Sequence, residues 1–217
     1  MATQNIKVYR DLMGENEKWA AATRTVLAER RLAMINLIGS PGSGKTTLIE
    51  STARQLGARF RAAVLEGDVE TTRDAERIAA LHIPVSQLLT GGACHLEAKL
   101  VHEALLDLPS ENLDLVIVEN VGNMVCPAEF DIGEHAKIAV LSVTEGEDKP
   151  LKYPLLFREA RAVVLTKTDL LPHLRFDLAA CEGFIHQVNA GIPVFKVSAQ
   201  SDEGLAAWTD WLLALRG

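Results

Sequence analysis

The sequence of 217 residues lacks a long hydrophobic run, an excess of positive charge and an even set of cysteines. No apolar stretch approaches the roughly 18 residues that span a bilayer, which excludes a transmembrane helix. A net charge of −7 argues against a surface built to bind nucleic acid or anionic lipid. The polar N-terminus does not resemble a signal peptide. Three cysteines predict reduced thiols in the cytoplasm rather than a disulfide framework.

The length of the chain suits one large domain with its own hydrophobic core. Hydrophobic residues make up 48% of the chain and charged residues 24%, which is ordinary for a globular protein. An alanine- and leucine-rich stretch over Glu15–Arg31 has no internal glycine or proline and predicts a helix. We therefore expect an N-terminal helical extension over residues 1–32, packed on a main domain over residues 33–217.

Six short apolar runs alternate with helical stretches after this extension. Continuous apolar runs are typical of strands buried on both faces, and their alternation with helices indicates a parallel sheet. The strands are expected at Ala33–Ile38, Ala62–Glu66, Asp114–Glu119, Lys137–Val143, Ala162–Thr166 and Pro193–Ser198. The predicted fold class is α/β, with a mainly parallel sheet flanked by helices on both faces. Ligands of such folds bind beyond the carboxyl ends of the strands.

The segment GSPGSGKT, Gly39–Thr46, directly follows the first predicted strand. It matches the P-loop pattern, in which glycines let backbone N–H groups surround phosphate oxygens. The N-terminus of the next helix adds to the attraction for the anion. Lys45 is expected to reach the β- and γ-phosphates, and the Thr46 hydroxyl to bind Mg²⁺. The predicted phosphate contacts come from Gly39, Gly42, Ser43, Gly44, Lys45, Thr46 and Thr47.

Two further motifs favour guanine as the base. The segment TKTD, Thr166–Asp169, follows a predicted strand and begins with threonine where asparagine is more common. The Asp169 carboxylate can accept both N1–H and the exocyclic amine of guanine, two bonds that adenine cannot reciprocate. The Lys167 stem would lie along the base, and Ser198 and Ala199 resemble the loop that reads guanine O6. Each motif alone is also compatible with an ordinary turn, but their order supports GTP.

Acidic residues at two strand ends are candidates for a role in hydrolysis. Asp68 and Glu119 end the second and third predicted strands, where carboxylates can hold Mg²⁺ or orient a water, and the N–H of Gly122 can sense the γ-phosphate. The alternative for either acid is an exposed loop carboxylate. The candidate catalytic residues are Lys45, Asp68 and Glu119; the candidate Mg²⁺ ligands are Thr46, Asp68 and Glu119. The exposed alternative is preferred for Glu70, Asp74 and Glu76.

Cys94 and His95 stand side by side in TGGACHLEA, just before a predicted helix. Adjacent side chains are expected to diverge, and two ligands are too few for a closed tetrahedral site. Cys126 would complete a set of two thiolates and one imidazole, which suits Zn²⁺ or Ni²⁺. Two alternatives stay open for this pair: buried filler and a Cys–His nucleophile. Cys181, inside a helical stretch, is expected to be a small buried hydrophobe.

Six blocks of the sequence together resemble the hydrogenase nickel-incorporation GTPases, the HypB family. They are GSPGSGKTTL, EGDVETTRDA, LLTGGACHLEA, ENVGNMVCPAEFDIGE, EDKPLKYPLLF and LTKTDLLPH. The resemblance runs from about Ile35 to the C-terminus. It implies a P-loop NTPase domain of the SIMIBI type that uses GTP/GDP and Mg²⁺ and helps deliver Ni²⁺ to a [NiFe]-hydrogenase precursor. On this resemblance, Cys94, His95 and Cys126 bind Ni²⁺ or Zn²⁺ at a dimer interface.

The resemblance also implies partners: a second copy of the chain, bound in the presence of GTP or metal, a maturation metallochaperone and the hydrogenase large-subunit precursor. Lys149 or Lys152 would contact nucleotide or the partner subunit, unless both are exposed loop lysines. The N-terminal cysteine- or histidine-rich tract of some family members is missing from MATQNIKVYRDLM. The alternative functions are a metal-binding module whose nucleotide only controls assembly, a urease-type nickel GTPase and a small-molecule kinase. The urease-type Cys-Pro-His arrangement is not found.

Overall fold

The computed structural model describes residues 2–57, 61–68, 73–109 and 113–215, with side chains from residue 14 onward except that of Asp68. It contains a seven-stranded sheet in the order β3-β2-β4-β1-β5-β6-β7, in which every neighbouring pair is parallel. The strands are β1 (Ala33–Ile38), β2 (Ala62–Asp68), β3 (Val85–Leu89), β4 (Leu115–Glu119), β5 (Ala136–Ser142), β6 (Ala160–Thr166) and β7 (Val194–Val197). The predicted α/β fold class is confirmed.

Strand β3 was not predicted from the sequence. Its residues VSQLL include a serine and a glutamine, and most of them are only half-buried. This composition follows from its position, since β3 is the edge strand and pairs only with β2. The acid-bearing strand ends therefore belong to β2 and β4, which are neighbours in the sheet and pair Glu66 with Glu119.

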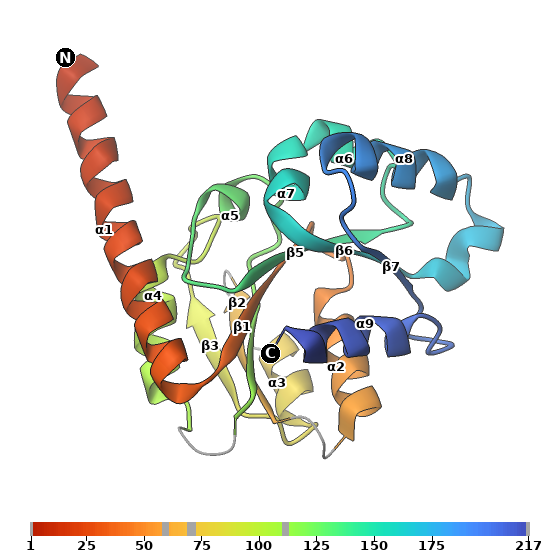
Figure 1. Cartoon of the computed structure of the whole chain (residues 1–217), viewed down its shortest axis with the longest axis horizontal. Helices are drawn as coiled ribbons and strands as arrows, with labels where there is room; N and C mark the ends of the chain where they lie inside the picture. The colour runs from red at the N-terminus through yellow and green to blue at the C-terminus, as the bar shows by residue number, and fades with distance from the viewer. Residues whose placement is uncertain (1, 58–60, 69–72, 110–112, 216–217) are drawn as a thin grey trace.

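Helices cover both faces of the sheet (Figure 1). Helices α2 and α9 pack on one face in a cluster that includes Trp208. On the other face, α1 and α4 cover one half of the sheet, and α7 and α8 cover the other half. The helices are α1 (Ala2–Arg30), α2 (Lys45–Leu56), α3 (Arg73–Ala79), α4 (Ala98–Asp107), α5 (Cys126–Glu129), α6 (Lys149–Lys152), α7 (Pro154–Glu159), the 3-10 helix η2 (Thr168–His173), α8 (Leu178–Val188) and α9 (Leu205–Ala214).

Helix α1 begins well before the predicted Glu15 and projects away from the sheet at its N-terminal end (Figure 1). Its C-terminal part is anchored on α4. Ala20 and Leu27 are fully buried, and the hydroxyl of Thr23 lies 3.3 Å from Nδ1 of His102. Arg30 donates a hydrogen bond to the carbonyl of Leu105. Neither α1 nor any other helix among the described residues is long and apolar enough to cross a membrane.

All strands of the sheet point the same way, so the segments that follow them meet at one edge. The P-loop follows β1, the metal-ligand pair follows β3, Glu119 ends β4, and the TKTD motif overlaps the end of β6. Parallel topology thereby gathers motifs that are far apart in the chain. This is the edge at which α/β sheets bind ligands.

Candidate functional site

The P-loop is held open by a left-handed turn at its last glycine. Gly44 has φ of 92° and caps α2, which begins at Lys45. A side chain is strained at such a φ, so glycine is required there. The ammonium group of Lys45 is buried and donates to the carbonyls of Gly39 and Ser40 at 3.4 and 3.5 Å. Burial lowers the pKa of Lys45, an effect that an arriving phosphate would reverse.

A cavity of about 480 Å³ lies in front of the P-loop. Its volume is within the range of roughly 300–1,000 Å³ that is usual for small-molecule sites. The predicted residues that line it are Gly42, Gly44, Lys45, Thr46, Thr47, Glu119, Gly122 and Lys167. Gly39 and Ser43 lie behind this wall. Ser43 is fully buried, and its hydroxyl has no hydrogen-bond partner among the described residues.

Thr46 and Glu119 meet inside the cavity. The Thr46 hydroxyl donates to Oε1 of Glu119 at 2.8 Å. Oε2 of Glu119 is buried and receives no hydrogen bond from the residues that the structure describes. Burial raises the pKa of Glu119 to about 7, although nearby Lys45 opposes the increase. A buried carboxylate oxygen without a donor, beside a hydroxyl, fits Mg²⁺, which prefers oxygen ligands. Asp68 ends β2, but its side chain lies outside the described residues, as does all of Glu70.

The first two residues of TKTD fasten β6 to the P-loop. Thr166 donates from its hydroxyl to the carbonyl of Ser43 at 2.6 Å. Lys167 donates from Nζ to the carbonyl of Gly42 at 2.7 Å, and its own φ is 60°. The contact of Thr166 with the P-loop needs only a hydroxyl group. This explains why threonine is compatible with the first position of the motif.

Asp169 and Ser198 also lie together, because Ser198 donates from its hydroxyl to Oδ1 of Asp169 at 2.8 Å. A small cavity of about 50 Å³ is lined by Thr166, Lys167 and Ala199 among others. Both cavities have Gly44, Thr47 and Lys167 in their walls. The expected base contacts Thr166, Lys167 and Ala199 therefore lie in a region continuous with the phosphate cavity, whereas Asp169 and Ser198 line neither cavity.

The loop after β4 rests directly on the P-loop. A Cβ at Gly122 would lie 2.7 Å from Cγ of Pro41, so no larger residue fits without a shift. The next residue, Asn123, forms an isolated antiparallel bridge with Gly39. If a bound phosphate displaced either the P-loop or this loop, the other would therefore have to move as well.

Cys94, His95 and Cys126 come together beyond the same edge of the sheet. One ligand atom of each residue lies within 4.8 Å of the other two, and no other such group occurs in the described part of the chain. The expectation that Cys94 and His95 diverge is wrong: Sγ of Cys94 is 3.6 Å from Nδ1 of His95. Just before this pair, the N–H of Ala93 donates to the carbonyl of Thr90 at 3.2 Å and closes a turn.

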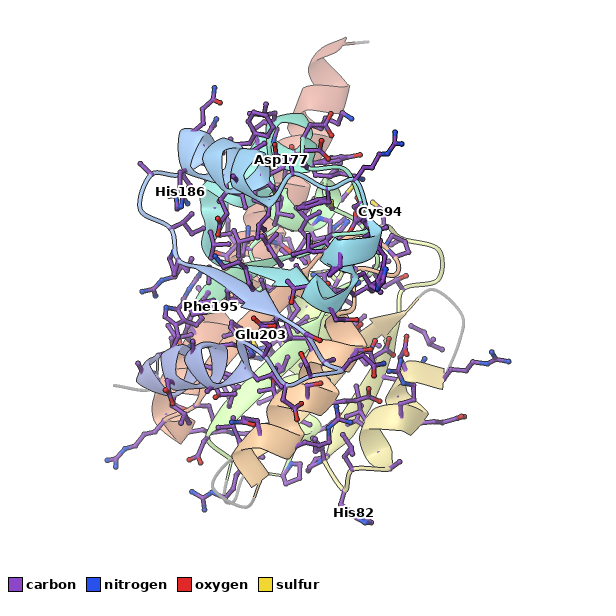
Figure 2. The ribbon with its side chains drawn as sticks, turned by 90° about the vertical axis from the view of Figure 1, so that its right-hand side faces the viewer. His82, Cys94, Asp177, His186, Phe195 and Glu203 are labelled. Carbon is purple, nitrogen blue, oxygen red and sulfur yellow. The ribbon has the colours of Figure 1, made fainter. Side chains whose placement is uncertain are left out.

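The surroundings of these three residues favour metal binding over the two alternatives. A nucleophilic thiol needs a lowered pKa, whereas a hydrogen bond with Cys126 raises the pKa of Cys94. Cys94 is exposed and Cys126 half-buried, so the filler alternative is wrong for Cys94 (Figure 2). The ring of His95 stacks on Phe130 with centroids 3.9 Å apart, and burial lowers the pKa of His95. A neutral imidazole held by a ring stack is ready to act as a ligand.

Cys181 behaves as expected from the sequence. It is fully buried in α8, and burial raises the pKa of its thiol to about 12. The thiol therefore stays protonated and packs as an apolar group. His82 and His186 lie on other parts of the molecule than Cys94 (Figure 2), so they supply no ligand to the cluster.

Arg77 and Asp74 of α3 also line the phosphate cavity, which the sequence did not indicate. Asp74 was expected to be an exposed acid, but it is half-buried and pairs with Arg77 at 2.7 Å. Arg77 also pairs with Glu50 at 2.8 Å and donates to the hydroxyl of Thr47 at 3.3 Å. No motif marks these two residues; only the packing of α3 against α2 brings them to the cavity. Glu76 is exposed, as predicted.

Lys149 and Lys152 lie outside the cavity wall in this single chain. Lys149 is 3.6 Å from Glu145 and lies over the ring of Tyr153. Lys152 pairs with Asp148 at 2.7 Å. Their proposed contacts with nucleotide or a second subunit stay predictions.

The all-parallel sheet, the P-loop and its cavity define a P-loop nucleotide-binding domain. A family model described as "CobW/HypB/UreG, nucleotide-binding domain" matches residues 33–196. The chain belongs to the HypB family within this group, as its sequence blocks indicated.

Two curated relatives and one solved structure illustrate the match. The "Hydrogenase maturation factor HypB" of Azotobacter vinelandii is 49% identical over 212 residues, which cover 98% of this chain and 70% of the relative. The protein of the same name from Escherichia coli K12 is 46% identical over 207 residues, which cover 95% of this chain and 71% of the relative. The crystal structure of HypB from Helicobacter pylori in complex with nickel has a TM-score of 0.88 and 35% identity, and covers 93% of this chain and 95% of that chain.

Proposed function

We propose that this chain binds and hydrolyses GTP and uses the nucleotide state to control delivery of Ni²⁺ during maturation of [NiFe]-hydrogenase. One observation carries the proposal: the eight residues from Glu119 to Cys126 begin in the phosphate cavity and end in the thiol–imidazole cluster. A change at the γ-phosphate is therefore only a short stretch of chain away from a metal ligand. The names of the relatives and the nickel-bound structure of one of them support nickel as the cargo.

For the nucleotide, Lys45 would neutralise the β- and γ-phosphates, while Asp169, Lys167 and Ala199 would hold guanine. Thr46 and Glu119, with Asp68 from β2, would hold Mg²⁺, which supplies positive charge to the triphosphate when it is bound. Glu119 is suited to this role because its buried Oε2 accepts no hydrogen bond from the described residues. A pKa near 7 would fall when a cation binds beside it.

For the cargo, two thiolates and an imidazole suit Ni²⁺ or Zn²⁺, and the Helicobacter pylori structure favours nickel. Three protein ligands leave at least one coordination position open, which a second subunit can fill. Val125, next to Cys126, is 52% exposed although it is apolar. An apolar residue at the rim of an incomplete site supports a homodimer formed around the metal. The further partners that we propose from the family resemblance are a maturation metallochaperone and the hydrogenase large-subunit precursor. Exposed thiols of this kind fit a reducing cytoplasm.

Nickel affinity is expected to differ between the two nucleotide states. A coupling of about 1–3 kcal/mol between two sites corresponds to a change of roughly 5–150-fold, and the metal must shift nucleotide affinity by the same factor. We would titrate Ni²⁺ into the full chain with GDP and with a non-hydrolysable GTP analogue, and measure the oligomer mass alongside. Equal nickel affinities with a nucleotide-dependent mass would instead support the metal-binding module whose nucleotide only controls assembly.

The base specificity is expected to change with Asp169→Asn. The asparagine keeps an acceptor for N1–H but replaces the second acceptor with an amide donor, which clashes with the amine of guanine and suits the carbonyl of xanthine. A bidentate pair of this kind discriminates between bases by about 1–3 kcal/mol. The affinity for GTP should therefore fall, and that for xanthosine triphosphate should rise, in competition assays. Unchanged GTP affinity would remove Asp169 from the base site, and phosphate transfer to an added acceptor without hydrolysis would favour the kinase alternative.

A further inference from the structure

Two stretches of chain meet between the nucleotide cavity and the metal cluster. The first is Glu119–Cys126, here called the connecting segment. The second is Thr90–Glu97, here called the metal loop, which carries Cys94 and His95. The two stretches come from different parts of the chain. Hydrogen bonds between side chain and backbone fix their position relative to each other.

The nucleotide end of the connecting segment is fixed by the P-loop. Glu119 accepts a hydrogen bond from Thr46, and Gly122 is in contact with Pro41. Asn123 bridges Gly39 through its backbone. Any movement of the P-loop or of Glu119 on nucleotide exchange is thus transmitted to the backbone of residues 119–123.

The same residues 119–123 also hold the metal loop, through two side-chain amides. Asn123 donates from Nδ2 to the carbonyl of Cys94 at 3.1 Å. Asn120, which is fully buried, accepts from the N–H of Leu96 at 3.3 Å and donates to Asn36 at 3.1 Å. The two amides therefore hold the backbone on both sides of His95.

We infer that Asn120 and Asn123 are positioning residues that make the geometry of the metal loop depend on the nucleotide state. This inference rests on the proposed function. With the connecting segment in the position described here, both hydrogen bonds form and the three ligand atoms converge. A nucleotide that displaces the segment strains or breaks these bonds and frees the metal loop. Nickel then binds less tightly, because the loop must be ordered again.

The test uses Asn123→Ala in the full chain, because Asn123 is only half-buried and its loss should not unfold the domain. The measured quantity is the ratio of nickel dissociation constants with GDP and with a non-hydrolysable GTP analogue. A hydrogen bond made in only one state contributes enough to shrink this ratio roughly 2- to 10-fold. A second variant, Asn123→Asp, keeps the acceptor that binds the N–H of Val125 but removes the donor to Cys94. The ratio should shrink for this variant too.

Thr90→Ala is the matched control. Its hydroxyl donates to the carbonyl of Ala93 at 3.0 Å, a bond inside the metal loop that does not involve the connecting segment. Its loss should weaken nickel binding equally in both nucleotide states and leave the ratio unchanged. The inference is overturned if Asn123→Ala keeps the wild-type ratio or if Thr90→Ala shrinks it equally. A wild-type ratio of one would overturn the proposed nucleotide control itself.

Discussion

Lys45→Ala is expected to remove almost all GTP turnover while the domain stays folded. Among the described residues, Nζ of Lys45 donates only two hydrogen bonds, both long, to P-loop carbonyls at 3.4 and 3.5 Å, so its loss should cost the fold little. For the reaction, removing a charge aimed at the transition state typically costs about 10²–10³ in kcat. The affinity for the triphosphate should fall as well, because a buried cation no longer meets it.

The same substitution should also change how Glu119 titrates. Of the two nearby cations that oppose the rise in the pKa of Glu119, Lys45 has the larger effect and Arg77 the smaller. Without Lys45, this pKa should move above its value of about 7, so more of the carboxyl is protonated at neutral pH and Mg²⁺ binds less well. Residual turnover of the variant should therefore increase with pH across the neutral range. Phosphate release measured at several pH values tests both expectations.

Lys196→Ala is a suitable control for the loss of a lysine. Lys196 lies on β7 and pairs with Glu182 at 2.9 Å in an exposed ion pair, which contributes only about 0–1 kcal/mol to stability. It has no contact with either nucleotide cavity, so its variant should turn over GTP at the wild-type rate. Wild-type turnover by Lys45→Ala would remove the lysine from the mechanism.

The central strands were readable from the sequence because each is a continuous apolar run. Strand β1 is buried along its whole length, as is β4, so nearly every position is apolar. The exceptions, Asn36 and Glu119, are buried and hydrogen-bonded. The edge strand β3 is not buried along its length, and its serine and glutamine interrupt the apolar run that would have predicted a strand. Helix α3 was missed for a related reason, since the segment RDAERIA buries only Ile78.

The two sites differ in how far local sequence determines them. The P-loop is one uninterrupted segment, so its residues, its strand and its helix are visible together. The metal cluster is not local, because Cys126 joins Cys94 and His95 only through the order of β2, β3 and β4 in the sheet. Residue chemistry left this set open, and the family resemblance identified it. The proximity of the three ligand atoms agrees with that resemblance.

Arg77 illustrates a contact that no local pattern encodes. It reaches the phosphate cavity only because α3 packs beside α2. There, Glu50 and Thr47 accept hydrogen bonds from its guanidinium. The hydrogen bonds that Arg77 donates to Glu50 and Asp74 raise its pKa, although partial burial lowers it. In the sequence, Arg77 is one arginine of a polar segment. In the folded chain, its positive charge lies in the wall of the phosphate cavity.

Cys94→Ala is expected to weaken nickel binding by more than about 100-fold, because the loss of outer-shell partners alone typically costs 10–100-fold. Cys94 is exposed, so the variant should fold, and its side chain lies outside the phosphate cavity. GTP turnover by the isolated protein should therefore stay close to that of the wild type. Titration with Ni²⁺, followed through the thiolate-to-nickel charge-transfer absorbance, measures the loss.

Cys181→Ala separates the loss of a ligand from the loss of any thiol. Its side chain is buried in α8, and its pKa of about 12 keeps the thiol protonated. This variant should lose some stability through the small cavity that it leaves but bind nickel as the wild type does. Cys94→Ala should show the opposite pattern, with unchanged stability and lost nickel. If Cys94→Ala instead unfolds the domain and keeps its nickel, the thiol serves packing rather than coordination, and the cluster is not a delivery site.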